Sequence, residues 1–301
     1  MVAVSGMFAS MTRTVFASLA GLAMAAGGFA GAASAGSLWE RAEALVPFFA
    51  DYEMEHSGEI AEPGIAAVSG RLVLEFRGGP CAGYVNVGRM VTVLDTTEGD
   101  RLVTDTRTRT VEHIDGTMTF ENETFNGGTQ LESAAGTARR VDDGLRVVLT
   151  QPRDAEIDLP GDLAFPTEQV VRVLAAARRG QRFLPLDVYD GSADGSLVYQ
   201  TATVIGAPET EPLVVDDLDG AVDVSAFVGR ERWPVIISHF ERGGDDGDSV
   251  PDFVLAFDLY DNGISRDFDV DYREFSMTGR LVRLELLPRE TCDGEGAGEG
   301  E

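Results

Sequence analysis

The dominant pattern in this chain is an alternation of apolar and polar residues with a period of two, which is typical of half-exposed β-strands. Residues 50–55 alternate apolar with acidic side chains, and Leu72, Leu74 and Phe76 share one face of the following segment. The same pattern predicts further strands, which lie at 84–95, 101–114, 117–125, 130–141, 145–151, 182–189, 197–205, 234–240, 253–260, 264–275 and 279–287.

The predicted strands are separated by strong turn signals. Asp261, Asn262 and Gly263 stand between two apolar runs, and this Asn-Gly type of sequence favours a tight hairpin. Similar signals occur at 115–116, 126–128 and 143–144. Many strands joined by short turns indicate a mainly β fold, in which one large antiparallel sheet is curved or closed to protect its edges.

One segment interrupts this pattern and predicts a helix from about Pro166 to Arg179. Proline is favoured in a first helical turn, Arg178 and Arg179 suit the C-terminal end of the helix dipole, and Gly180 ends the helix. Its apolar stripe must be buried, so we expect the helix to pack on the sheet as a plug or a lid. A shorter helix is predicted at 38–46.

The predicted strand around 104–110 is unusual because both of its faces are polar. One face is all threonine, and the other places Asp105, Arg107 and Arg109 in line. Such a strand is expected either at an open sheet edge or in a barrel with a wet, polar interior. In the second case, Arg107 and Arg109 would be ligand-binding residues that hold an anionic headgroup or a sugar carboxylate by bidentate hydrogen bonds.

The charge of the chain narrows the possible functions. The formal net charge is −27, and all 24 basic residues are arginines. Without lysine there can be no phosphate-loop lysine and no Schiff base with pyridoxal phosphate. The acidic balance argues against nucleic acid and against anionic membrane surfaces as partners. A solvated acidic surface is the simplest explanation of the charge.

The N-terminus reads as an export signal. Arg13 is followed by an uncharged stretch from Val15 to Ala32, and 33–35 (Ala-Ser-Ala) fits a small-x-small cleavage site. We therefore expect a signal peptide at 1–35, cleaved after Ala35, and a protein that does not span the membrane afterwards. A retained anchor is the alternative, since the uncharged stretch is just long enough for the roughly 20 residues of a membrane span. The remainder divides into one barrel domain at 36–292 and a disordered acidic tail at 293–301.

Cys81 and Cys292 are the only cysteines, and they bracket nearly all the predicted strands. In an exported protein such a pair predicts a disulfide, because exported proteins fold in an oxidising compartment. The bridge would place the two ends of the strand region side by side.

No constellation of residues predicts catalysis, a metal site or a cofactor. The three histidines, His56, His113 and His239, are far apart in sequence, with no ligand partner at metal spacing. Residues 190–195 resemble the first half of a calcium loop, but Thr201 stands where a bidentate glutamate is needed, so a hairpin turn is the preferred interpretation. The acidic loop at 245–248 has the carboxylates to hold calcium, and a solvated loop explains it equally well.

A set of short motifs, taken in order, carries a family resemblance. They are Gly79-Pro80-Cys81-Ala82-Gly83-Tyr84, Phe165-Pro166-Thr167, Val188-Tyr189-Asp190-Gly191-Ser192, Val198-Tyr199, Trp233-Pro234-Val235, Leu259-Tyr260-Asp261-Asn262-Gly263-Ile264-Ser265 and Asp271-Tyr272 with Phe275. Together they resemble the EipB family of alphaproteobacterial cell-envelope integrity proteins. The resemblance implies a periplasmic spiral β-barrel similar to the lipoprotein carriers and regulators of the Lol and RseB type. It also implies a disulfide between Cys81 and Cys292, a periplasmic tetratricopeptide-repeat partner and no enzymatic activity.

Three functional hypotheses follow from these observations. The first is a non-enzymatic periplasmic protein that supports envelope integrity by binding a partner protein, with a lipidic or polymeric ligand in the barrel. The second is a carrier of lipoproteins or lipids, which rests on analogy of fold. The third is an envelope glycan hydrolase that uses a pair of carboxylates.

Overall fold

The computed structural model describes residues 45–58, 64–210, 221–243 and 250–290. The strands are β1 (Phe48–Ser57), β2 (Ile65–Gly79), β3 (Gly83–Thr96), β4 (Arg101–Glu112), β5 (Thr117–Asn126), β6 (Thr129–Val141), β7 (Gly144–Gln151), β8 (Ala155–Pro160), β9 (Leu163–Ala164), β10 (Phe183–Val188), β11 (Tyr199–Ile205), β12 (Arg232–Glu241), β13 (Phe253–Tyr260), β14 (Ser265–Tyr272) and β15 (Phe275–Leu286). The helices are α3 (Pro166–Arg178) and the short 3-10 helix η3 (Val224–Ala226).

All these strands belong to one 15-stranded sheet with the order β8-β7-β6-β5-β4-β3-β2-β1-β15-β14-β13-β12-β11-β10-β9. Neighbouring strands are antiparallel, except that β9 pairs with β10 in parallel. Neighbours in space are therefore neighbours in sequence, apart from the junction of β1 with β15. The sheet consists of two meanders that meet at this junction.

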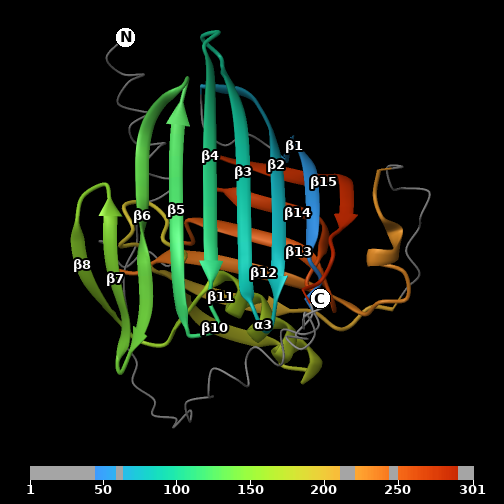
Figure 1. Cartoon of the computed structure of the whole chain (residues 1–301). Helices are drawn as coiled ribbons and strands as arrows, with labels where there is room; N and C mark the ends of the chain where they lie inside the picture. The colour runs from blue at the N-terminus through green and yellow to red at the C-terminus, as the bar shows by residue number, and fades with distance from the viewer. Residues whose placement is uncertain (1–44, 59–63, 211–220, 244–249, 291–301) are drawn as a thin grey trace, which may run out of the picture.

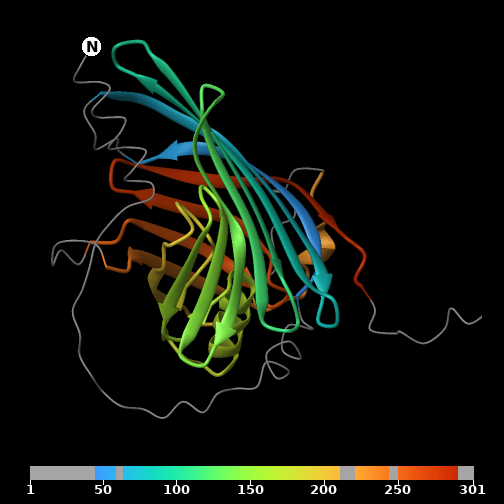
Figure 2. The same cartoon turned by 60° about the vertical axis from the view of Figure 1, so that its left-hand side comes forward.

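The sheet curls into a nearly closed barrel. Strands β2–β6 form the front wall in Figure 1, and β12–β15 cross behind them. The turned view in Figure 2 shows the same two walls, with β7 and β8 curling toward the helix. The prediction of a mainly β fold, with one antiparallel sheet curled into a spiral barrel around a packed helix, is confirmed.

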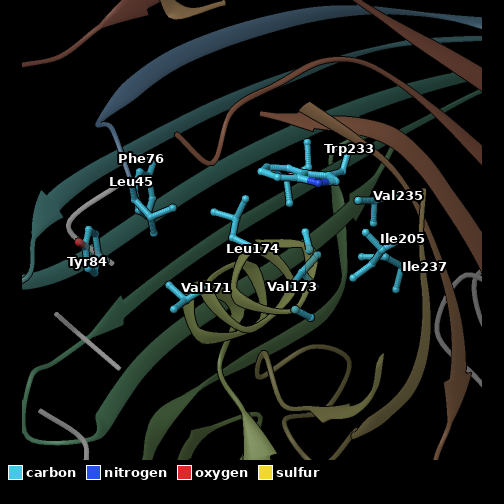
Figure 3. Packing of buried hydrophobic residues seen from close by; sticks show 13 residues of the cluster. Leu45, Phe76, Tyr84, Val171, Val173, Leu174, Ile205, Trp233, Val235 and Ile237 are labelled. Atoms are coloured by element: carbon cyan, nitrogen blue, oxygen red, sulfur yellow. The ribbon is translucent and has the colours of Figure 1, made fainter. Parts of the chain in front are cut away.

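Helix α3 ends within one residue of the predicted boundary and plugs the lower part of the barrel. Its apolar stripe packs against the inner faces of β11–β13 and of β2–β3. In Figure 3, Leu174 points toward Trp233, while Val173 lies on the side of Ile205 and Ile237. Burial of this stripe holds the helix inside the curved sheet, as expected for a single amphipathic helix.

Some predicted elements differ from the structure. The predicted strand at 264–275 is two strands, because the chain turns at Arg273 and Glu274. Strand β8 and the two-residue β9 were not predicted. Of the predicted helix at 38–46, only Leu45 and Val46 are described, and they are not helical. The signal peptide with Ala35 and the tail at 293–301 lie outside the described residues.

Candidate functional site in the barrel interior

Strand register fixes which side chains of β4 point into the barrel. A Cβ built on Gly88 would lie 2.7 Å from Thr108 Oγ1 and 3.4 Å from Leu74 Cδ2, so these side chains share the inner face. Thr110, two residues further along β4, is buried opposite Phe120 of β5. Because side chains alternate along a strand, the threonines of β4 face inward and the charged residues between them face outward.

A group of large apolar side chains faces this interior without being fully buried. We call it the apolar wall, and it consists of Leu72, Leu74, Met90, Leu255, Phe257 and Phe268. Leu72, Met90, Leu255 and Phe268 all pack against one buried cluster that contains Met54 and Met277. Interior positions of a filled barrel are normally closed to solvent. Their partial exposure therefore means that the middle of the barrel keeps an accessible apolar surface.

The apolar wall borders a row of hydroxyl groups, which we call the hydroxyl wall: Thr92, Thr104, Thr106 and Thr108. The two walls meet where Met90 pairs directly with Thr106 across β3 and β4. Further hydrogen-bonding groups continue the row onto β5, where Thr124 pairs with Thr106 and Asn126 with Thr104. The interior is thus amphipathic, and it can hold a molecule with an apolar part and hydrogen-bonding groups side by side.

Other parts of the interior are filled by the chain itself. The segment between β10 and β11 packs on the inner face of β5–β7, where Tyr189 and Val198 join a buried cluster with Phe120. The side-chain nitrogen of Asn122 donates a hydrogen bond of 2.7 Å to the carbonyl of Gly191 in this segment. Together with α3, this segment confines the accessible interior to the apolar and hydroxyl walls.

Two glutamates tie the start of α3 to the sheet. The backbone nitrogen of Thr167 donates a 2.6 Å hydrogen bond to Glu112 Oε1, at the end of β4. Glu168 is paired with Arg140 of β6 and accepts a 3.1 Å hydrogen bond from the backbone nitrogen of Phe165. Burial raises the pKa of Glu112 to about 7. Each carboxyl group accepts a hydrogen bond from a backbone nitrogen at the start of the helix, so both anchor the plug.

An arginine bridges the seam between the two ends of the sheet. Arg242, which follows β12, donates a 2.6 Å hydrogen bond from Nη1 to the carbonyl of Pro160 in β8. The same nitrogen lies 3.5 Å from Asp187 Oδ2 of β10. Since β8 and β9 are the ends of the sheet, this side chain links the two edges that a closed barrel would pair.

The two arginines predicted to bind a ligand do not face the interior. Strand β4 pairs with β3 and β5, so the alternative of an edge strand is wrong as well. Arg107 is paired with Asp105 at 2.8 Å and lies over the Phe125 ring, with its Cζ 4.7 Å from the ring centroid. Arg109 is exposed on the same outer face. The inner face of β4 is formed by its threonines.

Only one cysteine of the predicted disulfide lies among the described residues. Cys81 lies in the turn between β2 and β3, and Cys292 lies outside the described residues. A Cβ on Gly79 would be 3.2 Å from the carbonyl oxygen of Glu290, so the segment before Cys81 lies against the segment before Cys292. This contact agrees with the pairing, which remains a prediction.

His239 and the calcium-like loop make contacts within the fold. His239 stacks on Phe253 at 4.1 Å between ring centroids, and burial lowers its pKa to about 4. In the loop, Asp190 accepts a hydrogen bond from the backbone nitrogen of Ser192, and Asp194 accepts one from that of Ser196. Within the described residues, no three His, Cys, Asp or Glu side chains are grouped so that they could hold a metal ion. No helix in this part of the chain has the length and apolar character that a membrane crossing requires.

Comparison with known proteins gives one consistent relationship. The EipB-like family model matches residues 40–288. The cell envelope integrity protein EipB of Brucella abortus is 36% identical over 261 residues, which cover 86% of this chain and 89% of that protein. A crystal structure of a β-barrel-like protein of unknown function from Brucella abortus superimposes with a TM-score of 0.73 at 35% identity, covering 81% of this chain and 99% of that one. This chain therefore belongs to the EipB-like family.

Proposed function

We propose that this protein is a non-enzymatic periplasmic protein that supports the integrity of the cell envelope. Its relative from Brucella abortus is named for this role, and the N-terminal sequence predicts an export signal. We further propose that the barrel interior holds an amphiphilic ligand, lipidic or polymeric, and that the protein acts with a partner protein such as a periplasmic tetratricopeptide-repeat protein.

The observation that carries the ligand proposal is the direct contact of an apolar and a hydroxyl wall inside the barrel. Met90 and Thr106 are cross-strand neighbours, and both remain partly accessible. An acyl chain would bury the apolar wall, which is favourable by about 25 cal/mol for each Å² removed from water. Ester, amide or hydroxyl groups of the same ligand would hydrogen-bond to the threonines. The neutral lining favours an uncharged polar part over an anionic one.

The same lining argues against a glycan hydrolase, the third hypothesis. Hydrolysis of a glycosidic bond needs two carboxyl groups on either side of the substrate. The apolar and hydroxyl walls contain no carboxyl group, and Glu112, further along the inner face of β4, is buried against the start of α3. A lipid or lipoprotein carrier, the second hypothesis, would use the same interior and differs only in whether the ligand is passed on.

Two measurements test this proposal. Native mass spectrometry of the protein purified from the periplasm should detect a co-purifying acyl-containing or polymeric molecule, which organic extraction should release. Deletion of the gene should increase sensitivity to detergent and to cell-wall antibiotics. Unchanged sensitivity would contradict the envelope role, whereas an empty barrel in every preparation would contradict only the ligand. Transfer of the bound molecule to acceptor vesicles would favour a carrier.

A further inference from the structure

Three large apolar side chains form an unbroken row on the outside of the barrel. Phe183 of β10 pairs with Val204 of β11, and Val204 pairs with Ile236 of β12. Their neighbours along the strands, such as Ile205 and Val235, are buried in the core, so the row faces outward. Phe183 is 54% exposed, Val204 50% and Ile236 45%. Single exposed apolar residues are ordinary, but a contiguous row across three strands is not.

The outward positions in the middle of this surface are uncharged, and charged groups stand nearer the strand ends, where Arg232 pairs with Asp258 and Asp187 lies 3.5 Å from Arg242. The same outward face carries Pro185, Ala202, Ser238, Val254 and Ala256 on the four strands β10–β13. We call this surface the outer apolar face. On the opposite outside wall, β3 and β4 carry an ion-pair network in which Arg89 and Arg107 both bond to Asp105. Since 25% of all residues are charged, a block of uncharged outward positions across the middle of four neighbouring strands is unusual and suits a surface that a partner covers.

One border of the outer apolar face is acidic. The row continues from Ala256 to Asp269 of β14, and the next row runs from Val254 to Asp271. Both carboxylates are exposed and accept hydrogen bonds from hydroxyl groups of β15: Thr278 donates to Asp269, and Ser276 to Asp271. Neither has an ion-pair partner among the described residues. A ligand on the apolar face would thus meet two uncompensated negative charges at its side.

We propose that the outer apolar face docks a protein partner through an amphipathic segment whose apolar residues are flanked by lysine or arginine. This inference rests on the proposed role of a partner and assigns the surface for it. The negative charge at the border of this face excludes other kinds of binding partner. A second copy of this chain, with net charge −27, would bring the same acidic border, and an anionic membrane would be repelled.

The position of β10 indicates how the partner docks. Strand β9 covers β10 only at Asp187 and Val188, which leaves the first part of β10 as a sheet edge. Pro185 stands in that part and has no N–H to donate, so an added strand would pair poorly there. The partner is therefore held by side chains on the face of the sheet, as when an amphipathic helix lies in an apolar groove.

A matched pair of variants tests the site. Ile236→Arg places a positive charge in the centre of the outer apolar face, and Val148→Arg makes the same change at an outward residue of β7 that is 48% exposed. The probes are two labelled synthetic helical peptides with the same leucine face, one bordered by arginine and the other by glutamate. Fluorescence anisotropy with the purified mature protein measures binding, and thermal unfolding checks that both variants fold.

We expect the arginine-bordered peptide to bind, and Ile236→Arg to weaken binding by about tenfold or more, as for a central interface residue. Val148→Arg should leave binding unchanged, and Asp269→Asn with Asp271→Asn should weaken it and reduce its dependence on salt. Equal binding of both peptides, or of neither, would overturn the proposal. The proposal would also be overturned if the protein formed dimers, or bound vesicles of anionic lipid, and Ile236→Arg abolished that dimerisation or binding. Because this readout is independent of detergent sensitivity, it can fail while the envelope role holds.

Discussion

The backbone nitrogen of Thr167 lies 2.6 Å from Oε1 of Glu112, a residue 55 positions earlier in the chain. This hydrogen bond joins the end of β4 to the start of α3. The other carboxyl oxygen of Glu112 is buried and has no hydrogen-bond partner. A buried carboxyl without full compensation prefers its neutral form, which is why its pKa is raised to about 7.

This pairing predicts a pH-dependent stability. In the unfolded chain Glu112 ionises near its ordinary pKa of 4.5, whereas in the folded protein it stays protonated until about pH 7. The folded state therefore binds more protons between these values, and its stability falls as pH rises from about 4.5 to 7. A shift of this size corresponds to about 3 kcal/mol. Denaturant unfolding of the wild type and of Glu112→Gln between pH 4.5 and 8 should show the variant gaining relative stability as pH rises.

The control for this prediction is Glu121→Gln, which changes an exposed glutamate on the outer face of β5. Its stability should follow that of the wild type at every pH. If Glu112→Gln also follows the wild type across the range, Glu112 does not titrate as its burial implies.

Arg242 is expected to hold the seam of the barrel closed. Its replacement by glutamine should remove the charged hydrogen bond to Pro160 and the contact with Asp187, and lower the free energy of unfolding by about 1–2 kcal/mol. Hydrogen exchange should increase in β8 and in β9–β10. Arg146→Gln is the matched control, because Arg146 pairs with Asp158 of β8 from the adjacent strand and does not cross the seam. Equal exchange in both variants would mean that Arg242 does not close the barrel.

The interior site can be tested by filling it. Thr106→Trp adds a large side chain to the hydroxyl wall, and Arg107→Trp adds the same side chain to the outer face of the same strand. We expect Thr106→Trp to weaken binding of a fluorescent, uncharged acyl ester by about tenfold, which corresponds to 1.4 kcal/mol. Arg107→Trp should bind like the wild type in the same titration. Equal affinity of the two variants would show that the acyl ester does not occupy the interior.

The predicted disulfide has a stability signature. Cys81→Ser should lower the melting temperature by as much as reductant does in the unmodified protein, and the two treatments together should have no further effect. In the chain-entropy model, a disulfide that closes a loop of about 210 residues stabilises the folded protein by at most roughly 5 kcal/mol. A melting temperature that reductant leaves unchanged would mean that Cys81 and Cys292 do not pair.

The sequence predicted the strands best where both the strand pattern and the turn were visible. The hairpin at Asn262 and Gly263 is an example, since Tyr260 and Ile264 are joined there by a backbone hydrogen bond of 3.0 Å. The turn at Arg273 and Glu274 was missed because neither residue favours a turn by its backbone conformation. Strand β8 was missed because it is short and ends in Pro160.

The site was harder to predict because it depends on contacts between distant segments. On β4, both faces are polar, so alternation alone could not decide whether the threonines or the arginines point inward. That choice is made by Gly88, whose lack of a side chain leaves room for Thr108. The anchor between Glu112 and Thr167 likewise joins segments that share no local pattern.

The junction of β1 with β15 has a consequence for how the chain matures. A ribosome releases a protein from its N-terminus, so the strands of the meander β1–β8 emerge before those of the second meander. Throughout that time β1 offers an unpaired edge, since its second partner is the last strand of the sheet. The unpaired edge of β1 can therefore pair with other chains until the final strand emerges. A chain that ends before β15 would keep this unpaired edge and remain prone to aggregation.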